Sequence, residues 1–379
     1  MKKIPFYLII FFLLVLVSCR NEKEKIYLGA DLSYINEMED CGGVYRHNRQ
    51  VVDPFALFAE KGANLIRVRL WHTPTWSGYS DFQDVKKTIR RSKEQKMEVL
   101  LDFHYSDTWA DPQHQVIPKA WKDIRDLTVL GDSLYNYTFK TLMNLEKDGL
   151  LPEFVQVGNE TNIEIMQQED SMVVDKINWK RDIFLLNKGI EAVKDASAKA
   201  GKKIQIMIHI AQPENALWWF NDAINAGLTG FEWIALSYYP KWSVYPFKDI
   251  PVAIDSLKKR FNKRVMIVET AYPFTLANAD SANNLLGEDA LIPGYPATPE
   301  GQLKYLTDLT TLTLQGGGEG VNYWEPAWIS TRCKTPWGQG SHWDNAIFFD
   351  AGNNNEALPA FEFFGHTASA KDVSMNIPR

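Results

Sequence analysis

The chain has 379 residues, of which 45% are hydrophobic and 23% are charged. This length allows one large domain or two ordinary ones, and this composition excludes a globally disordered protein. The formal net charge is −6 and no basic block follows the N-terminal segment, which argues against a nucleic-acid-binding protein. The 13 Trp residues are a mild indication of carbohydrate binding, because sugar rings present flat C–H faces that stack on aromatic rings, although we expect most of them to lie in the core.

The first residues have the pattern of a targeting segment. Lys2 and Lys3 precede an apolar run over residues 4–17, which is too short for a comfortable membrane span. The run closes with Leu-Val-Ser-Cys at 16–19, which resembles the bacterial lipobox, where cleavage precedes the cysteine and its thiol is acylated. A plain signal peptide with an incidental cysteine is the alternative. We therefore predict a lipoprotein signal peptide over 1–18, a lipidated Cys19 with a polar tether over 19–27, and a catalytic domain over 28–379.

This segment predicts an extracytoplasmic protein. Lipid on Cys19 would anchor it to a bacterial membrane, which we expect to be an outer membrane with the protein at the cell surface, while a periplasmic position stays open. In an oxidising compartment Cys41 and Cys333 could form one disulfide, but their spacing equally allows two free thiols. We expect a monomer.

From residue 27 onward one unit recurs, in which an apolar run ends in a polar or aromatic cluster and an amphipathic stretch follows. The runs predicted to be strands are 28–32, 65–70, 98–103, 154–158, 205–209, 233–237, 265–268 and 320–324. Helical patterns include 82–95, 133–147, 181–200, 218–226, 252–261 and 298–315. This alternation predicts an α/β protein with a single (β/α)8 TIM barrel. An open doubly wound sheet is the alternative, but no Gly-rich phosphate turn follows the first run.

Two of the predicted strands end in glutamate. The fourth leads into Asn159 and Glu160, and the seventh leads into Glu269. In a barrel the carboxyl ends of the strands carry function, and a carboxylate there is costly unless it is paired or used. A retaining glycosidase needs one acid for the leaving oxygen and one carboxylate that attacks the sugar. We therefore expect Glu160 and Glu269, on roughly opposite sides of the barrel, to form this pair; for either one alone, a surface carboxylate or a structural ion pair is the alternative.

Other polar residues bear on these two glutamates. Arg67 and Arg69 share one face of the second strand and could hold the nucleophile ionised, while its surroundings keep the other glutamate protonated. His104 and His209 lack the spacing of a zinc site, because no His-x-x-x-His or Cys-x-x-Cys is present. We interpret them as hydrogen-bond partners of a sugar or of the catalytic residues, and we expect no cofactor for the catalysis.

Several stretches carry a resemblance to a known family. They are 29–34 (Gly-Ala-Asp-Leu-Ser-Tyr), 66–71 (Ile-Arg-Val-Arg-Leu-Trp), 101–112 (Leu-Asp-Phe-His-Tyr-Ser-Asp-Thr-Trp-Ala-Asp-Pro), 157–160, 237–240, 268–270 and 323–328 (Tyr-Trp-Glu-Pro-Ala-Trp). In these the chain resembles the endo-β-1,4-galactanases of glycoside hydrolase family 53, in the clan of retaining (β/α)8 glycosidases. The resemblance implies Glu160 as the acid/base and Glu269 as the nucleophile. It also implies hydrolysis of β-1,4-galactosidic bonds inside galactan, the side chain of type I arabinogalactan in pectin.

The same resemblance implies residues that bind the polysaccharide. Arg69, Asn159 and Tyr238 should shape the site of the reacting sugar, and Trp324 should form its floor. The other predicted substrate-binding residues, at strand ends or neighbouring subsites, are Asp102, His104, Trp109, Asp111, His209 and Trp328.

Some bacterial members of the family carry calcium in the loop after the seventh strand. Here that loop has Asn278, Asp280 and Asn284, and Asp350 could supply a further oxygen. The loop departs from the bacterial pattern, because Ala282 replaces a His and Asn278 replaces an Asp. The sequence is compatible with a structural calcium that takes no part in the chemistry, and equally with an ordinary polar loop.

Two other functions stay open at this stage. One is an endo-β-glycanase of the same clan that acts on mannan or glucan, since galactose is implied by the family resemblance alone. The other is a lipoprotein that captures a glycan without cutting it, although two glutamates at strand ends have no evident use in such a protein.

Overall fold

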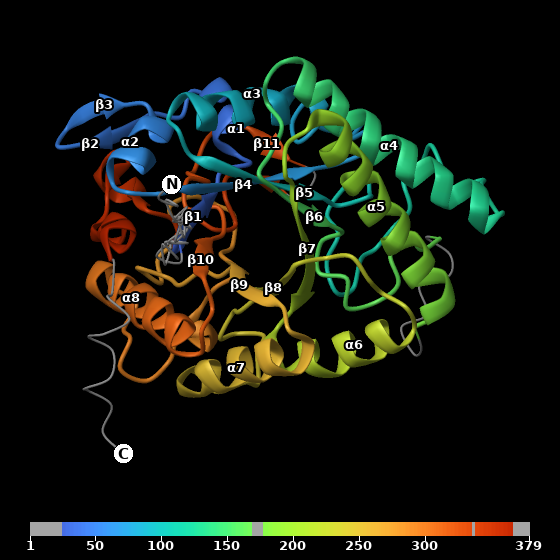
Figure 1. Cartoon of the computed structure of the whole chain (residues 1–379). Coiled ribbons are helices and arrows are strands. Elements are labelled where there is room, and N and C mark those ends of the chain that lie inside the picture. Colours follow the sequence, from blue (N-terminus) through green and yellow to red (C-terminus); the bar gives the residue numbers. More distant parts are fainter. Residues whose placement is uncertain (1–24, 169–176, 336–337, 367–379) are drawn as a thin grey trace, which may run out of the picture.

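Eight parallel strands close into a barrel in the order β1-β10-β9-β8-β7-β6-β5-β4 (Figure 1). They are β1 Tyr27–Asp31, β4 Leu65–Leu70, β5 Glu98–Phe103, β6 Phe154–Val157, β7 Gln205–Ala211, β8 Trp233–Ser237, β9 Arg264–Glu269 and β10 Gly320–Tyr323. The computed structural model describes residues 25–168, 177–335 and 338–366, so the predicted signal peptide and acylated cysteine lie outside the described residues. The predicted (β/α)8 fold is confirmed, and each of the eight predicted runs forms a barrel strand.

Side chains of the strands fill the amino end of the barrel. Tyr27, Phe154 and Trp233 meet edge to face at ring-centroid distances of 5.2 to 6.0 Å, within a buried cluster inside the ring of strands. Burying side chains of this size contributes about 1.5–3 kcal/mol each. The guanidinium of Arg264 lies over the Trp233 ring and pairs with Glu319. This end is therefore occupied by packed side chains, and the cavity described below lies at the carboxyl ends of the strands.

Helices surround the barrel and alternate with its strands (Figure 1). They are α1 Ile35–Asp40, α2 Pro54–Glu60, α3 Phe82–Glu94, α4 Leu127–Lys147, α5 Trp179–Ala200, α6 Pro213–Asn225, α7 Ile250–Phe261 and α8 Pro299–Gln315. Asp81, Asp126 and Thr298 accept backbone hydrogen bonds at the first turns of α3, α4 and α8, which explains where these helices begin. The sequence did not predict α1 and α2, because six and seven residues are too few to display a helical period.

Short strands follow the barrel strands β1 and β10, and short 3-10 turns follow β8, β9 and β10. They are β2 Tyr45–His47, β3 Gln50–Val52, β11 Lys334–Thr335, β12 Gly338–Gln339, β13 Phe349–Asp350 and β14 Glu356–Ala357, with 3-10 turns η1 Phe247–Asp249, η2 Glu288–Ala290, η3 Ala351–Asn353 and η4 Pro359–Gly365. The order β13-β14-β2-β3 joins the segment after β1 to the segment after β10 in one small sheet. No helix within the described ranges has the length and hydropathy needed to cross a membrane.

A disulfide links the same two segments. Cys41 and Cys333 are bonded, with their Cα atoms 5.6 Å apart. Of the two alternatives that the sequence allowed, the structure therefore has the disulfide. The bond holds α1 to the loop that follows β10, at the edge of the barrel mouth.

Candidate active site

Glu160 and Glu269 line one cavity of about 580 Å³ at the barrel mouth. Glu269 is the last residue of β9, and Glu160 follows β6 by three residues. In the barrel order β6 and β9 are three of eight places apart, where four would be directly opposite, so the two glutamates lie on roughly opposite sides of the mouth, as expected. Both side chains are buried.

The backbone at Glu160 is held in an unusual conformation. Its φ of 43° is left-handed, which costs about 1–2 kcal/mol for a residue other than glycine. Its N–H donates to His209 Nδ1 (3.3 Å), and its carbonyl accepts from Asn162 N–H (2.7 Å) and Gln115 Nε2 (3.2 Å). These contacts fix the direction of the Glu160 side chain, and strain of this kind is typical of functional sites.

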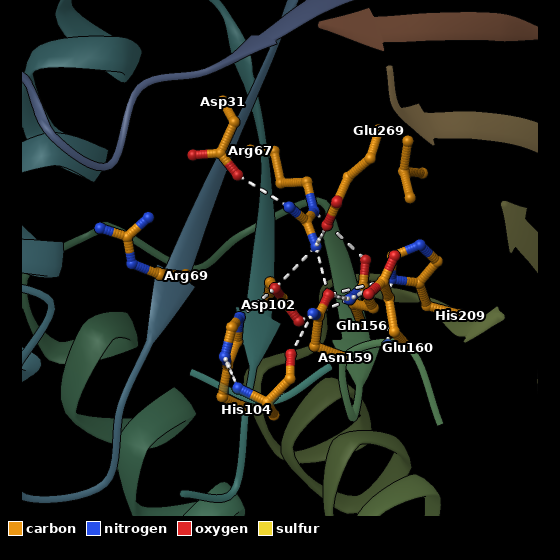
Figure 2. A network of polar contacts seen from close by, with 12 residues as sticks. Asp31, Arg67, Arg69, Asp102, His104, Gln156, Asn159, Glu160, His209 and Glu269 are labelled. Atoms are coloured by element: carbon orange, nitrogen blue, oxygen red, sulfur yellow. Dashed lines mark hydrogen bonds and ion pairs between the residues drawn. The ribbon is translucent and has the colours of Figure 1, made fainter. Parts of the chain in front are cut away.

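Arg67 lies at the centre of a buried polar network (Figure 2). Its Nη1 pairs with Asp31 (2.8 Å), and its Nη2 pairs with Asp102 and Glu269 (2.7 Å each). Nη2 also donates to Asn159 Oδ1 at 2.7 Å. Burial opposes the charge of Arg67, but the three carboxylates raise its pKa above the usual range, so the guanidinium stays charged. Arg67 therefore ties the ends of β1, β5 and β9 to one another.

Glu269 is held in its carboxylate form by two donors. Arg67 contacts Oε1, and the Tyr239 hydroxyl donates to Oε2 at 3.1 Å. The pKa of Glu269 is raised to about 7, chiefly by burial; the charge of Arg67 and the Tyr239 hydrogen bond oppose this shift, and the charge of Asp102 adds to it. Above that pH the group has the charge that a nucleophile requires.

Glu160 is the protonated member of the pair. Burial raises the pKa of Glu160 well above its usual range, and the charge of Glu269 adds to this shift. The Ser237 hydroxyl donates to Glu160 Oε1 at 2.5 Å and lowers the pKa in part. Because Arg67 binds Glu269 directly, the proton that the two carboxylates compete for resides on Glu160.

His209 orients Ser237 toward Glu160. Burial lowers the pKa of His209 well below its usual value, so the ring is neutral. Its Nδ1 accepts the N–H of Glu160, which leaves the proton on Nε2, and Nε2 donates to Ser237 Oγ at 2.9 Å. His209 is fully buried, so of the two roles that the sequence left open its contacts favour a partner of the catalytic residues over a partner of the sugar.

Asp102 and His104 support the network from β5. His104 Nδ1 accepts the N–H of Ala110 (3.1 Å), so Nε2 carries the proton and donates to Asp102 at 3.0 Å. Gln156 donates to the other oxygen of Asp102 at 2.6 Å. Asp102 is fully buried and holds Arg67 instead of lining the cavity, whereas His104 does line it. For Asp102 the predicted substrate contact is therefore corrected to a supporting role.

Arg69 stands apart from this network (Figure 2). Its Nη1 pairs with Glu325 at 2.6 Å, and its guanidinium lies 4.2 to 4.9 Å from three aromatic ring centroids, including that of Trp109. Alternate residues of a strand share a face, but Arg69 lies two residues nearer the mouth than Arg67. The expectation of an arginine that holds the nucleophile ionised is therefore met by Arg67 alone, while Arg69 lines the cavity beside Trp109.

Tyr238, which was predicted to contact the sugar, does not line the cavity, and its neighbour Tyr239 does. The Tyr238 hydroxyl donates to the carbonyl of Tyr245 at 3.1 Å, and its ring is not part of the cavity lining. Tyr239 lines the cavity and contacts Glu269. The pairing of β8 with β9 is irregular at the end of β8, which changes the alternation of side chains at this point.

Aromatic side chains form much of the cavity wall. Trp109 and Trp324 lie there as predicted, with ring centroids 5.8 Å apart. Trp328 packs behind Trp324 at 6.2 Å and does not line the cavity, so its predicted subsite is corrected to a supporting contact. Trp242 and Trp343 also line the cavity. The sequence analysis did not single out these two residues, because they lie in loops without a strand end to mark them.

Two further predicted residues line the cavity. Asp111 accepts from the N–H of Gln113 (2.7 Å) and pairs with His114 (2.9 Å) in an exposed part of the rim. The Asn159 amide donates to the carbonyl of Ala110 at 2.7 Å, while its oxygen faces Arg67. Both side chains are thus fixed beside the two glutamates.

Polar side chains of the loop after β9, where calcium was considered, accept hydrogen bonds from the protein. Asp280 accepts from the Ser330 hydroxyl (2.5 Å), from the N–H of Ser341 (2.8 Å) and from the N–H of Ala282 (2.7 Å). Its carboxylate oxygens are therefore directed at protein donors. Calcium needs six to eight oxygen ligands, and the described part of the chain has no group of three or more His, Cys, Asp or Glu side chains that could hold a metal.

The other predicted calcium ligands are likewise engaged. The amide nitrogen of Asn284 donates to Asn278 Oδ1 (2.8 Å) and to Asp344 Oδ1 (2.7 Å). Asp350 instead accepts from the N–H of Gly352 (2.9 Å), at the start of η3. The carboxylate that joins the loop is thus Asp344, which the sequence analysis did not identify. These contacts favour the second of the two alternatives that the sequence left open, an ordinary polar loop fastened by hydrogen bonds within the protein.

Comparison with known proteins covers almost the whole described chain. The family model described as Glycosyl hydrolase family 53 matches residues 27–364. The chain belongs to this family. It is therefore a glycoside hydrolase, and the resemblance seen in the sequence motifs is confirmed.

Individual members of family 53 agree with this assignment. An arabinogalactan endo-β-1,4-galactanase of Cellvibrio japonicus is 59% identical over 343 residues, which cover 90% of this chain and 91% of the relative. The structure of a family 53 catalytic domain from Ignisphaera aggregans is 30% identical and superposes with a TM-score of 0.81, covering 91% of this chain and 97% of that domain. A fungal β-1,4-galactanase is 27% identical, with a TM-score of 0.75 and coverage of 90% and 99%.

Proposed function

We propose that this glycoside hydrolase cleaves β-1,4-galactosidic bonds inside galactan with retention of configuration. The observation that carries the proposal is the unequal environment of the two glutamates in one cavity. Glu269 is bound by a charged arginine, whereas Glu160 is buried without one in direct contact. Such a division into a carboxylate and a carboxylic acid is what a retaining glycosidase requires. Galactan as the substrate is supported by the name of the relative that is 59% identical.

In the first step Glu269 acts as the nucleophile. One of its carboxylate oxygens bonds to the anomeric carbon of the sugar as the bond to the leaving oxygen breaks. Glu160 transfers its proton to that oxygen, and a shortened galactan chain leaves. Arg67 and Tyr239 hold Glu269 in place during this attack.

In the second step Glu160 acts as a base. The covalent ester removes the charge of Glu269, which was one cause of the raised pKa of Glu160, so the ionised form of Glu160 becomes accessible. Glu160 takes a proton from water, and the water oxygen bonds to the anomeric carbon as the ester bond to Glu269 breaks. Two displacements at one carbon retain its configuration.

We further propose that the enzyme is an extracytoplasmic lipoprotein and a monomer. The motif that ends at Cys19 supports acylation and anchoring at an outer membrane, with the enzyme at the cell surface. The disulfide between Cys41 and Cys333 supports an oxidising compartment, because such bonds are rare in the cytosol. Metabolic labelling with a radioactive fatty acid tests the anchor, and a Cys19→Ala variant that still incorporates the label would contradict it.

Digestion of linear β-1,4-galactan tests the catalytic proposal. The wild type should release short galacto-oligosaccharides, and proton NMR of the first products should show the β-anomer. Glu160→Gln should lower the rate by about 10²–10⁴-fold, and Glu269→Gln should abolish turnover because the covalent step is lost. Release from mannan or glucan but not from galactan would refute the substrate, and an initial α-anomer would refute retention.

Glu319→Gln is a matched control for these variants. Glu319 is a buried glutamate that pairs with an arginine, but it lies at the amino end of β10, away from the cavity. This control should keep its turnover number on galactan even if it loses stability. A comparable loss of turnover in all three variants would point to misfolding instead of the proposed roles.

A further inference from the structure

Trp76 is an exposed aromatic residue beside the barrel mouth. It lies in the loop between β4 and α3, and 38% of its surface is accessible. It does not line the cavity that holds the two glutamates. A single exposed aromatic ring is common on protein surfaces and indicates little by itself, so its meaning depends on the residues around it.

One side of this ring contacts a second tryptophan, which in turn contacts a third at the cavity, through tilted and edge-to-face pairs. The ring centroids of Trp76 and Trp71 are 4.9 Å apart, and those of Trp71 and Trp109 are 5.5 Å apart. Trp71 is buried, and Trp109 lines the cavity. These distances place Trp76 no more than about 10 Å from Trp109. A sugar chain that leaves the cavity past Trp109 therefore needs to extend only a short way to reach Trp76.

The orientation of Trp76 is fixed before any ligand binds. Its indole N–H donates to the carbonyl of Asp107 at 3.1 Å. The carboxylate of Asp107 accepts from the N–H of Thr73 (2.9 Å) and of Lys119 (2.8 Å), which fastens the loop of Trp76 to the loop after β5. A ring held in this way loses little conformational entropy when a ligand stacks on it.

The barrel order indicates the direction of the chain. β4 and β8 are four places apart in the ring of eight strands, which puts them opposite each other. Trp76 follows β4, and Trp242, which is 47% exposed and lines the cavity, follows β8. A polysaccharide that stacks on both rings would cross the mouth between β6, which leads to Glu160, and β9, which ends in Glu269. Two exposed tryptophans on opposite sides of the mouth could bind a long chain on both sides of the bond that is cut.

We propose that Trp76 is an outer subsite that stacks on a galactosyl residue of the polymer beyond the cavity. The proposal rests on galactan as the substrate and adds a contact for chains too long to be held by the cavity alone. Trp76 does not touch the reacting atoms. It acts on binding of the polymer and leaves the chemical step unchanged.

The test compares a long and a short substrate. Kinetics of wild type and Trp76→Ala are measured on linear β-1,4-galactan and on β-1,4-galactotriose. We expect KM for galactan to rise about ten-fold, equivalent to about 1.4 kcal/mol, with kcat unchanged. The kcat/KM for the trisaccharide should stay within about two-fold of wild type, because three sugars that span the cleavage site do not reach the outer ring.

Further variants separate stacking from folding. Trp76→Phe keeps an aromatic face and should restore most of the affinity for galactan. Tyr135→Ala removes a ring from the outer surface of α4 and should leave both substrates unaffected. An equal loss on both substrates for Trp76→Ala would show that the residue supports Trp71 and Trp109 instead, and an unchanged KM for galactan would overturn the subsite. If the wild type does not cleave galactan at all, the proposed function fails, and this subsite fails with it.

Discussion

Removal of one hydroxyl next to the nucleophile tests the electrostatic argument. In Tyr239→Phe, Glu269 loses the hydrogen bond to Oε2 and keeps the ion pair of Oε1 with Arg67. Phenylalanine fills nearly the same volume, so the packing of the ring against Trp242 and Trp343 should persist. The main change is therefore the stability of the carboxylate form of Glu269.

The size of the effect follows from the hydrogen bond that is lost. A hydrogen bond to a charged group contributes about 1.5–3 kcal/mol, and Glu269 keeps slight solvent access through which water can replace the hydroxyl. We therefore take the lower end, about 1.5 kcal/mol, which corresponds to about one pKa unit. The sign is upward, because Tyr239 stabilises the ionised form and lowers the pKa of Glu269 in the wild type.

The pH profile of kcat/KM shows this shift directly. Glu269 reacts only when ionised, so its titration sets the acidic limb of the profile. In the wild type this limb should fall near pH 7, in line with the pKa of about 7 for Glu269. In Tyr239→Phe the midpoint of the acidic limb should move up by about one pH unit. At pH values well below this midpoint, kcat/KM should therefore fall about ten-fold more than it does on the plateau. The alkaline limb, set by Glu160, should move much less.

The measurement is hydrolysis of galactan by reducing-sugar release between about pH 4 and pH 10. Tyr238→Phe is the matched control, because this neighbouring hydroxyl bonds to a backbone carbonyl away from the cavity. Its profile should overlay that of the wild type. An acidic limb that stays in place in Tyr239→Phe, or a shift equally large in the control, would refute the assignment of Glu269 as the ionised nucleophile.

Four other perturbations have defined outcomes. Ser237→Ala removes a donor to the ionised form of Glu160 and should raise its pKa, so the alkaline limb of kcat/KM moves to higher pH; an unmoved or lowered limb would contradict this. Arg67→Met leaves buried carboxylates uncompensated and should lower the free energy of unfolding by about 3–5 kcal/mol, seen in denaturant titrations as a clearly lower midpoint than in the wild type. Replacement of Cys41 and Cys333 by Ser should cost about 2–5 kcal/mol in the same titration, whereas an unchanged midpoint would mean that the bond adds no stability. Chelation with EDTA should leave the melting temperature unchanged, because the loop after β9 directs its oxygens at protein donors; a fall of several degrees that added calcium reverses would refute this.

The sequence predicted the barrel because each strand is a short apolar run that ends in polar residues. Glu160 and Glu269 could be identified for the same reason, since strand ends are the one part of the barrel mouth that a sequence marks. The sequence did not show whether Arg67 or Arg69 reaches the polar network at the centre of the barrel. Arg67 and Arg69 have the same periodicity, and only their depth in the barrel decides that Arg67 meets the carboxylates.

Residues beyond the strand ends were predicted less well. Tyr238 and Tyr239 differ by one position, and the irregular pairing of β8 with β9 decides which of them faces the cavity. Trp76 and Trp242 lie in loops, where no period relates a residue to the barrel axis. Asp344 joins the loop after β9 through contacts of long sequence separation, which a local pattern does not contain.

The direction of β1 determines how a lipid-anchored enzyme would orient its active site relative to the membrane. β1 begins at Tyr27 at the amino end of the barrel, and the cavity opens at the other end, because all eight strands run parallel. A lipid on Cys19 would therefore hold the barrel by its closed base and turn the mouth toward the surroundings. The nine residues of the proposed tether span at most about 30 Å when extended. A long glycan could thus be cut from the outside, without having to thread between the enzyme and the bilayer.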